Sequence, residues 1–285
     1  MNVLEVDSLK VAFKINGKIS VPVRGVSFSV PQNGRVALVG ESGSGKSLTA
    51  LSVGGLVDRA MISGKIVKNG KISYVFQNPM QSLNPVMRVG RQIAEANRHA
   101  DVEALLDSVG LPRECSRKYP CQMSGGQQQR VMIAMALAAN ADLLVADEPT
   151  TALDVTTQQE VLDLVNRVAD ERKMAILLIT HNLGLVARYS KFVNVMYAGE
   201  IVESGNVDEV LSSPRHPYTK GLLAAVPRLD APKDAPLYDI PGVVPPPTDW
   251  PSGCAFHPRC PQAQPECSQS RQECCYGKRN SQIAS

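Results

Sequence analysis

The segment Gly40-Glu41-Ser42-Gly43-Ser44-Gly45-Lys46-Ser47 contains residue types that can bind phosphate groups. It matches the pattern G-x-x-x-x-G-K-[ST] at every fixed position, and its glycines allow backbone N–H groups to surround an anion. Lys46 can reach the β- and γ-phosphates of a nucleotide, and the Ser47 hydroxyl can ligate Mg²⁺. The segment therefore predicts a nucleotide site. Its expected contact residues are Gly40, Ser42, Gly43, Ser44, Gly45, Lys46 and Ser47.

Further along the chain, two carboxylates follow the apolar run 143–146. Asp147 at the end of a strand can hold Mg²⁺ near Ser47, and Glu148 can polarise the water that attacks a γ-phosphate. A solvated turn is the alternative interpretation of such a pair. It is disfavoured here because four apolar residues lead directly into the pair and Pro149 stops the strand. His181, which follows the apolar run 175–179, is on its own equally compatible with a packing role.

These residues need elements that position them, and the hydrophobic pattern predicts such elements. Short apolar runs predict strands at 35–39, at 142–148 (ending in the two carboxylates) and at 175–179, and amphipathic patterns predict helices at 128–139 and 156–172. Their alternation predicts an α/β fold with a mainly parallel sheet. Residues 1–35 are expected to be β-rich, with a hairpin turn at Asn16-Gly17. Phe13 in this region is equally suited to stacking on an adenine ring and to ordinary core packing.

The composition narrows the possible partners. The net charge of the 285-residue chain is +3, with both signs interspersed, so no polybasic surface is expected to bind nucleic acid or anionic lipid. The beginning of the sequence lacks the basic start and apolar stretch of a signal peptide. The longest apolar run, 174–179, is far shorter than a membrane span of roughly 18–20 residues. The sequence therefore predicts a soluble protein that can dock on a membrane partner.

Taken together, the motifs resemble the nucleotide-binding subunit of an ATP-binding cassette (ABC) transporter. The match runs in family order over about residues 3–212, and Ser124-Gly125-Gly126-Gln127 followed by 143–148 distinguishes it from other P-loop families. The resemblance implies a P-loop NTPase cassette at 1–212, with an antiparallel β-subdomain at its N-terminus and a helical subdomain at about 78–140. Two departures leave the phosphate and Mg²⁺ contacts unchanged. The segment before Gln77 is short, and Met123 replaces the commonest leucine.

The resemblance also implies roles for individual residues. Gln77 would sense Mg²⁺ and the attacking water, and His181 would contact the γ-phosphate, so Gln77, Glu148 and His181 form the catalytic set. Ser47, Gln77 and Asp147 would hold Mg²⁺. Ser124, Gly125, Gly126 and Gln127 would bind ATP held by a second subunit, and Asp154 would cross the dimer interface. The protein would then be an ATPase that works as a head-to-tail dimer, with ATP and Mg²⁺ as its ligands.

Two further segments resemble one branch of that family, the ATPases of dipeptide and oligopeptide importers. They are 76–85 and the tail motifs at 216–223 and 240–242. The implied partners are a homologous second ATPase, two membrane permeases and an extracytoplasmic solute-binding protein, with this chain at the cytoplasmic face of the membrane. The alternatives are uptake of nickel or a metal chelate, since that branch includes nickel importers, and a non-transport ABC protein. A further alternative is a regulatory partner subunit that binds ATP without hydrolysing it, but the presence of Glu148 and His181 disfavours it.

The composition changes after Leu211, where an irregular extension at 213–285 is expected. Thirteen of the twenty prolines fall from Pro214 onward, and five of the seven cysteines lie near the end of the sequence. Four of them, Cys254, Cys260, Cys267 and Cys274, are spaced as a ligand set, with Cys275 as a competing fourth ligand. Four thiolates suit an iron–sulfur cluster or zinc. The family resemblance implies a [4Fe-4S] cluster, with zinc or unligated cysteines as the alternatives.

Overall fold

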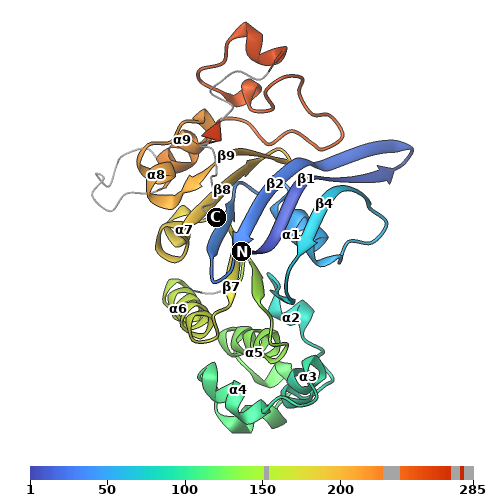
Figure 1. Ribbon diagram of the computed structural model, residues 1–285, viewed down its shortest axis with the longest axis vertical. Helices are drawn as coiled ribbons and strands as arrows, with labels where there is room; N and C mark the ends of the chain where they lie inside the picture. The colour runs from blue at the N-terminus through green and yellow to red at the C-terminus, as the bar shows by residue number, and fades with distance from the viewer. Residues whose placement is uncertain (151–153, 227–237, 271–276, 279–285) are drawn as a thin grey trace. The chain divides into compact units, whose positions relative to one another are not determined.

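The computed structural model describes residues 1–150, 154–226, 238–270 and 277–278 of the 285-residue chain. The chain forms two compact units (Figure 1). The first unit consists of Met1–Leu4, Val30–Gly34 and Lys68–Leu178. The second consists of Glu5–Ser29, Arg35–Val67 and Ile179–Ser285.

A β-hairpin forms much of the N-terminal part of the second unit. Its strands, β1 (Asn2–Ile15) and β2 (Lys18–Pro31), meet at Asn16 and Gly17. Both turn residues have positive φ, 50° and 79°, which is the backbone geometry of a two-residue hairpin turn. The predicted hairpin is confirmed. With β4 (Met61–Lys68), the hairpin forms a three-stranded sheet in the order β2-β1-β4.

Four neighbouring strands of a seven-stranded sheet belong to this unit, in the order β10 (Gly277–Lys278), β9 (Glu200–Asn206), β8 (Phe192–Tyr197) and β3 (Arg35–Val39), and β3 leads into the glycine-rich segment 40–47. Strand β3 is parallel to β8, which is antiparallel to β9. The short β10 is parallel to β9. All five residues of β3 are buried, as expected for a strand that is covered on both faces. Helix α1 (Lys46–Gly54) follows β3 after the glycine-rich segment.

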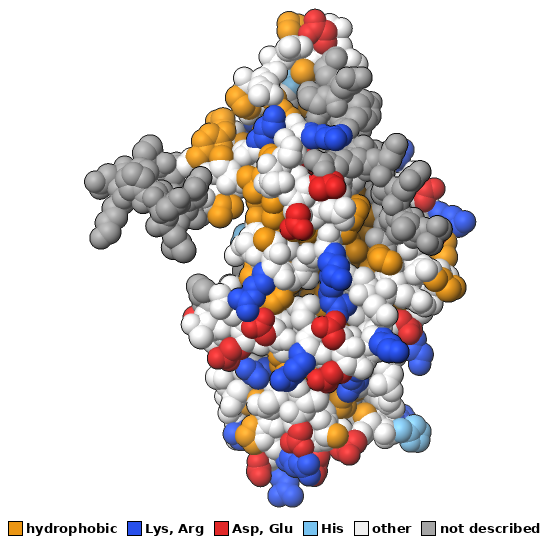
Figure 2. Space-filling view, turned by 60° about the vertical axis from the view of Figure 1, so that its left-hand side comes forward, with side chains coloured by type: hydrophobic (Ala, Val, Ile, Leu, Met, Phe, Trp, Pro, Cys, Tyr) orange, Lys and Arg blue, Asp and Glu red, His pale blue; other side chains and the backbone are white. Residues whose placement is uncertain are grey.

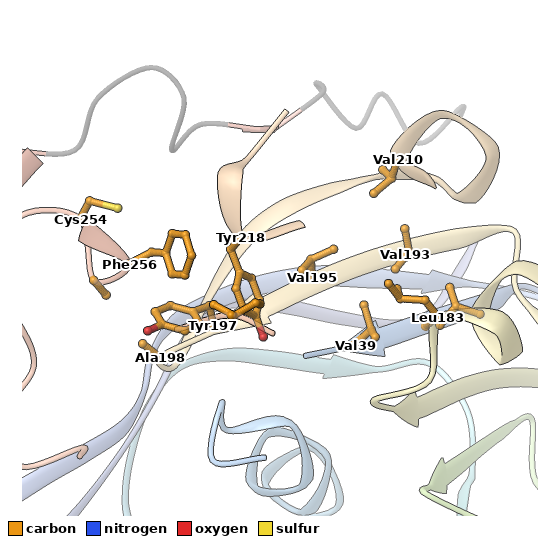
Figure 3. Close-up of a cluster of buried hydrophobic side chains, with 14 of the residues drawn as sticks. Val39, Leu183, Val193, Val195, Tyr197, Ala198, Val210, Tyr218, Cys254 and Phe256 are labelled. Atoms are coloured by element: carbon orange, nitrogen blue, oxygen red, sulfur yellow. The ribbon is translucent and has the colours of Figure 1, made fainter. Parts of the chain in front are cut away.

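Aromatic side chains pack the C-terminal segment of the second unit onto β8. The rings of Tyr197 on β8, Tyr218 on α9 and Phe256 lie with centroids 4.6–5.4 Å apart (Figure 3). They belong to the same buried cluster as Val193 and Val195 of β8. This packing is a source of order in the segment that its proline-rich composition did not predict. The remaining elements of the unit are α7 (Leu183–Tyr189), α8 (Val207–Ser212), α9 (Pro217–Ala224), η3 (His257–Arg259) and η4 (Pro265–Ser268).

The first unit combines buried strands with a group of helices. Strand β5 (Ile72–Val75) is parallel to β6 (Leu143–Asp147), and β7 (Ala175–Thr180) is next to β6 in the strand order. The helical elements are α2 (Pro79–Ser82), α3 (Val89–Ala96), α4 (Val102–Ser108), η1 (Arg113–Arg117), η2 (Pro120–Gln122), α5 (Gly125–Ala138) and α6 (Val155–Glu171). The apolar stripe predicted on α6 is confirmed, because Val161, Leu162, Val165, Val168 and Ala169 are all buried.

The predicted fold class is confirmed, since parallel strand pairs alternate with helices in an α/β arrangement. The domain boundaries, 1–212 with a helical part at 78–140 and an extension at 213–285, stay predictions. Figure 2 shows basic and acidic side chains intermixed over the face it displays. In the part of the chain that the structure describes, no helix is both long and apolar enough to span a bilayer.

Candidate nucleotide site

The phosphate-binding segment forms a tight loop between β3 and α1. At Gly40, a Cβ atom would collide with the carbonyl oxygen of Met196. At Gly45, φ is 98°, a backbone conformation that residues with a side chain rarely adopt, and a Cβ atom would lie 2.7 Å from the carbonyl oxygen of Pro22. Both the backbone conformation and the lack of space therefore exclude a larger residue. The loop can therefore form only with glycine at these positions, as the motif predicts.

Lys46 and Ser47 occupy the first turn of α1. The Lys46 side chain is buried, and its Nζ donates hydrogen bonds to the carbonyl oxygens of Gly40 (2.8 Å) and Glu41 (2.9 Å). No acidic residue lies in this first turn, so the positive end of the helix dipole faces the loop without competition. Within the described residues, the buried Ser44 Oγ has no hydrogen-bond partner. An unsatisfied donor and a buried ammonium in one glycine loop fit a bound phosphate chain.

His181 and Phe13 belong to the same unit as this loop. His181 is exposed and follows directly after β7. The next residue, Asn182, is the N-cap of α7 and accepts from the N–H of Gly184 at 2.9 Å, so His181 lies at a fixed strand-to-helix turn. Phe13 is half-buried on β1, which leaves both of its interpretations open.

The first unit brings Gln77 and Glu148 together. Asp147 is the buried last residue of β6, and Glu148 follows it with a left-handed backbone (φ 44°). Such a conformation is strained for a residue with a side chain and is often found at functional sites. Nε2 of Gln77 donates a hydrogen bond to Oε2 of Glu148 at 3.1 Å. Two of the three predicted catalytic side chains are therefore in direct contact.

The signature residues form the N-terminus of α5 through a reciprocal cap. Ser124 Oγ accepts from the N–H of Gln127 (3.3 Å), and Gln127 Oε1 accepts from the N–H of Ser124 (3.1 Å). Gly125 and Gly126 follow the cap, and a Cβ atom at Gly126 would lie 3.1 Å from the Thr157 side chain. The cap thus fixes a helix start made of small residues, which is an anion-binding geometry.

Asp154 caps the next helix, α6. Its Oδ1 accepts from the N–H of Thr157 (3.0 Å) and its Oδ2 from the Thr157 hydroxyl (2.8 Å). These hydrogen bonds hold the pKa of Asp154 below its ordinary value, so the carboxylate stays ionised. The preceding residues of the predicted interface loop, Ala152 and Leu153, lie outside the described residues.

The structure describes three of the five cysteines near the end of the sequence, Cys254, Cys260 and Cys267. Cys254 and Cys267 are buried and Cys260 is half-buried, and none of the three forms a disulfide with another described cysteine. The N–H of Cys254 donates to the carbonyl oxygen of Cys267 at 2.9 Å, so these two residues are neighbours. Cys274 and Cys275 lie outside the described residues, and within the described ones no three metal-ligating side chains gather.

Sequence reasoning missed three residues that support the phosphate loop. The Glu41 carboxylate accepts from Nη1 (2.8 Å) and Nη2 (3.0 Å) of Arg259, and the Glu41 N–H donates to the Tyr218 hydroxyl (2.8 Å). Burial raises the pKa of Tyr218, so this hydroxyl stays protonated. Arg259 is 218 positions from Glu41, and no local pattern in the sequence links residues so far apart.

Known families match both parts of the chain. The ABC transporter family matches residues 23–151, and the family "Oligopeptide/dipeptide transporter, C-terminal region" matches residues 202–267. A solved structure of an ATP-binding cassette, dimeric and bound to ADP and phosphate after hydrolysis, is 26% identical. It superposes with a TM-score of 0.62 over 72% of this chain and 98% of that one.

Two relatives match along most of their length. A Brucella ovis protein whose name describes a peptide import ATP-binding protein is 45% identical over 90% of this chain and 89% of its own. A Brucella abortus protein of the same description is 43% identical over 92% of this chain and 88% of its own. These matches confirm the resemblance to ABC transporter subunits. The chain therefore belongs to the ABC transporter family, as an ATP-binding cassette ATPase that contains the oligopeptide/dipeptide transporter C-terminal region.

Proposed function

We propose that this chain is the motor subunit of an importer for dipeptides and oligopeptides. The cargo class is supported by the C-terminal family match at residues 202–267 and by the names of the two Brucella relatives. Neither of those names mentions nickel or a metal chelate, so nothing in them favours that alternative. The observation that carries the motor function is the Gln77–Glu148 hydrogen bond, because it joins two groups suited to hydrolysis.

In this proposal, the phosphate loop binds ATP, and Gln77, Glu148 and His181 act on its γ-phosphate. Lys46 leaves its two carbonyl partners to contact the β- and γ-phosphates, and the loop N–H groups surround the chain. Mg²⁺ would be held by Ser47, Asp147 and Gln77, and when bound it neutralises charge on the phosphate oxygens. His181 would contact the γ-phosphate from the end of β7.

Glu148 is the residue that we assign to the attacking water. Its Oε2 is held by the Gln77 amide, and its other oxygen can accept a hydrogen bond from the water, which then attacks phosphorus in line with the departing ADP. The water proton passes to the carboxylate or to the phosphate that leaves. Hydrolysis needs this positioning more than covalent chemistry, which suits a group fixed at both its backbone and its side chain.

The composite site would require a second subunit. Ser124, Gly125, Gly126 and Gln127 would bind the γ-phosphate of ATP held by a homologous partner ATPase, and Asp154 would lie at that interface. The capped N-terminus of α5 supports this role, since it presents backbone N–H groups beside two glycines. Two membrane permeases and an extracytoplasmic binding protein would complete the importer, with this chain at the cytoplasmic face of the membrane.

Replacing Glu148 by glutamine tests the motor assignment. The variant should bind ATP like the wild type but lose hydrolysis by roughly a hundredfold or more, since general-base catalysis contributes about 10²–10⁴-fold. Glu95→Gln provides a matched control, because Glu95 is an exposed carboxylate paired with Arg91 on α3. If Glu148→Gln released phosphate from ATP at the wild-type rate, the assignment of Glu148 to the attacking water would be wrong.

The extension is proposed to hold a metal centre that pins it in place. The buried residues Cys254 and Cys267 are neighbours and form no disulfide with each other, which fits such a centre. Cys260 with Cys274 or Cys275 would supply the remaining thiolates. We favour [4Fe-4S] over zinc. When bound, the cluster would cross-link the segment. Protein purified without oxygen should contain about four irons and four sulfides per chain and absorb near roughly 400 nm. A content of one zinc per chain without colour would show that the site holds zinc and no iron–sulfur cluster. The absence of both metals would refute the proposal of a metal centre.

A further inference from the structure

Glu41 places a carboxylate in the loop that we assign to phosphate binding. A carboxylate there repels the negative charges of a nucleotide unless a cation neutralises it. Its side chain is 27% exposed, whereas that of its partner Arg259 is only 5% exposed. The ion pair is thus shielded from water on the side of the arginine, where charge–charge interactions are stronger than at an open surface.

Arg259 is itself held firmly in the C-terminal segment. Its Nε donates to the carbonyl oxygen of Pro241 (2.8 Å), and Nη2 donates to that of Ile240 (3.1 Å). Two further hydrogen bonds, from Nη1 and Nη2, form a bidentate pair with the two carboxylate oxygens of Glu41. The guanidinium also lies 5.8 Å from the centroid of the Tyr197 ring. A bidentate guanidinium pair fixes the direction of a carboxylate as well as its charge.

The main chain of Glu41 links this ion pair to the phosphate-binding residues. Its carbonyl oxygen accepts from Lys46 Nζ (2.9 Å) and from the N–H of Ser44 (3.2 Å). Its N–H donates to the hydroxyl of Tyr218, whose ring is fully buried against Tyr197 and Phe256 (Figure 3). Glu41 is therefore held through its N–H, its carbonyl oxygen and its carboxylate at once.

We propose that Arg259 is a positioning residue for the nucleotide site: it neutralises Glu41 and fixes the entry to the phosphate loop. The C-terminal segment thereby takes part in nucleotide binding, although none of its residues needs to touch the nucleotide. The proposal depends on the phosphate loop being the nucleotide site, but not on the nature of the cargo or of the cysteine centre.

A second-site rescue separates this role from mere structural support. The affinity of the full-length chain for Mg²⁺-ADP is measured by calorimetry for the wild type, Arg259→Met, Glu41→Gln and the double variant. Arg259→Met should weaken binding about tenfold, because it leaves a negative charge beside the phosphates. Adding Glu41→Gln removes that charge and should return the affinity to within about threefold of wild type.

Two controls accompany the series. Arg259→Lys keeps the charge but not the bidentate geometry, so its affinity should lie between those of the wild type and Arg259→Met. If Arg259→Met fails to fold, Arg259→Lys takes its place in the comparison with the double variant. Trp250→Phe removes another anchor of the same segment, the 2.8 Å hydrogen bond from Nε1 to the Val21 carbonyl oxygen, without touching Glu41. Its affinity should equal that of the wild type.

The outcomes are distinct. Arg259→Met with wild-type affinity, or a double variant no better than Arg259→Met, would overturn the proposal, since a purely structural arginine gives losses that accumulate. Loss of affinity in Trp250→Phe to the same extent as in Arg259→Met would also overturn it. A wild-type chain that does not bind Mg²⁺-ADP would instead contradict the assignment of the phosphate loop.

Discussion

If Glu148 acts on the attacking water as proposed, its hydrogen bond with Gln77 prepares the carboxylate for that step. Glu148 sits in a left-handed backbone conformation directly after a buried strand, so its main chain has little freedom. The Gln77 amide then occupies one carboxylate oxygen, which restricts rotation of the side chain. A base held in one orientation loses less entropy when the attacking water binds.

Replacing Gln77 by alanine should therefore lower kcat about tenfold, while KM for ATP changes by less than about threefold. Phosphate release measured over a range of ATP concentrations gives both values. Gln81→Ala is the matched control, because Gln81 is an exposed glutamine on α2 and should retain wild-type kcat. If kcat of Gln77→Ala equals that of the wild type, the hydrogen bond does not prepare Glu148.

At the scale of elements, the start of α5 shows where local patterns fail. The sequence predicted a helix at 128–139, but α5 begins at Gly125. Gly125 and Gly126 have low helix propensity, which disfavours a helix start at this point. The reciprocal cap between Ser124 and Gln127 satisfies the first N–H groups and outweighs that cost.

Helix α9 begins at a cap that is sensitive to pH. His216 is buried, and its Nδ1 accepts from the N–H of Tyr218 at 3.1 Å. Burial lowers the pKa of His216 from its ordinary value to about 4. The unfolded chain therefore binds a proton at a higher pH than the folded chain does. Stability from this group is complete above about pH 6.5 and is lost progressively as the pH falls toward 4.

Lowering the pH from 7 to 5 should thus reduce the free energy of unfolding by up to about 2 kcal/mol through His216. Asparagine at this position can cap the helix but does not titrate, so His216→Asn should lose less stability over the same pH interval. Urea unfolding at both pH values measures the difference. His99→Asn, at an exposed histidine, should keep the wild-type pH dependence. Equal pH dependence of His216→Asn and wild type would contradict this prediction.

At the scale of the whole molecule, the sequence predicted individual strands and helices but not the contacts between residues that are far apart in the chain. The strand before Gly40, the helix after it and the apolar stripe of α6 follow from short-range periodicity, and the structure confirms them. The pair Glu41–Arg259 and the contact of Tyr218 with Phe256 join positions far apart in the chain. Such pairs depend on how elements pack, and neither residue type nor spacing in one sequence records that.

The packing of Phe256 bears on what orders the C-terminal segment. Its ring is 2% exposed and lies 5.2 Å from that of Tyr197 and 5.4 Å from that of Tyr218. Replacing it by alanine leaves a cavity beside β8, which should cost about 3–5 kcal/mol of stability. Val243→Ala, in the same segment but 82% exposed, should change stability by less than about 0.5 kcal/mol.

Proteolysis of the chelator-treated, metal-free chain then tests whether the aromatic cluster or a bound metal orders the C-terminal segment. If the aromatic cluster holds the segment, metal-free wild-type chain should resist cleavage within 238–268, whereas metal-free Phe256→Ala should be cut there rapidly, because cleavage follows the population of the opened segment. Equal and rapid cleavage of both chains would show that the segment depends on its cysteines alone. Since Arg259 lies within this segment, the same opening should also release Glu41, so faster cleavage should coincide with weaker nucleotide binding.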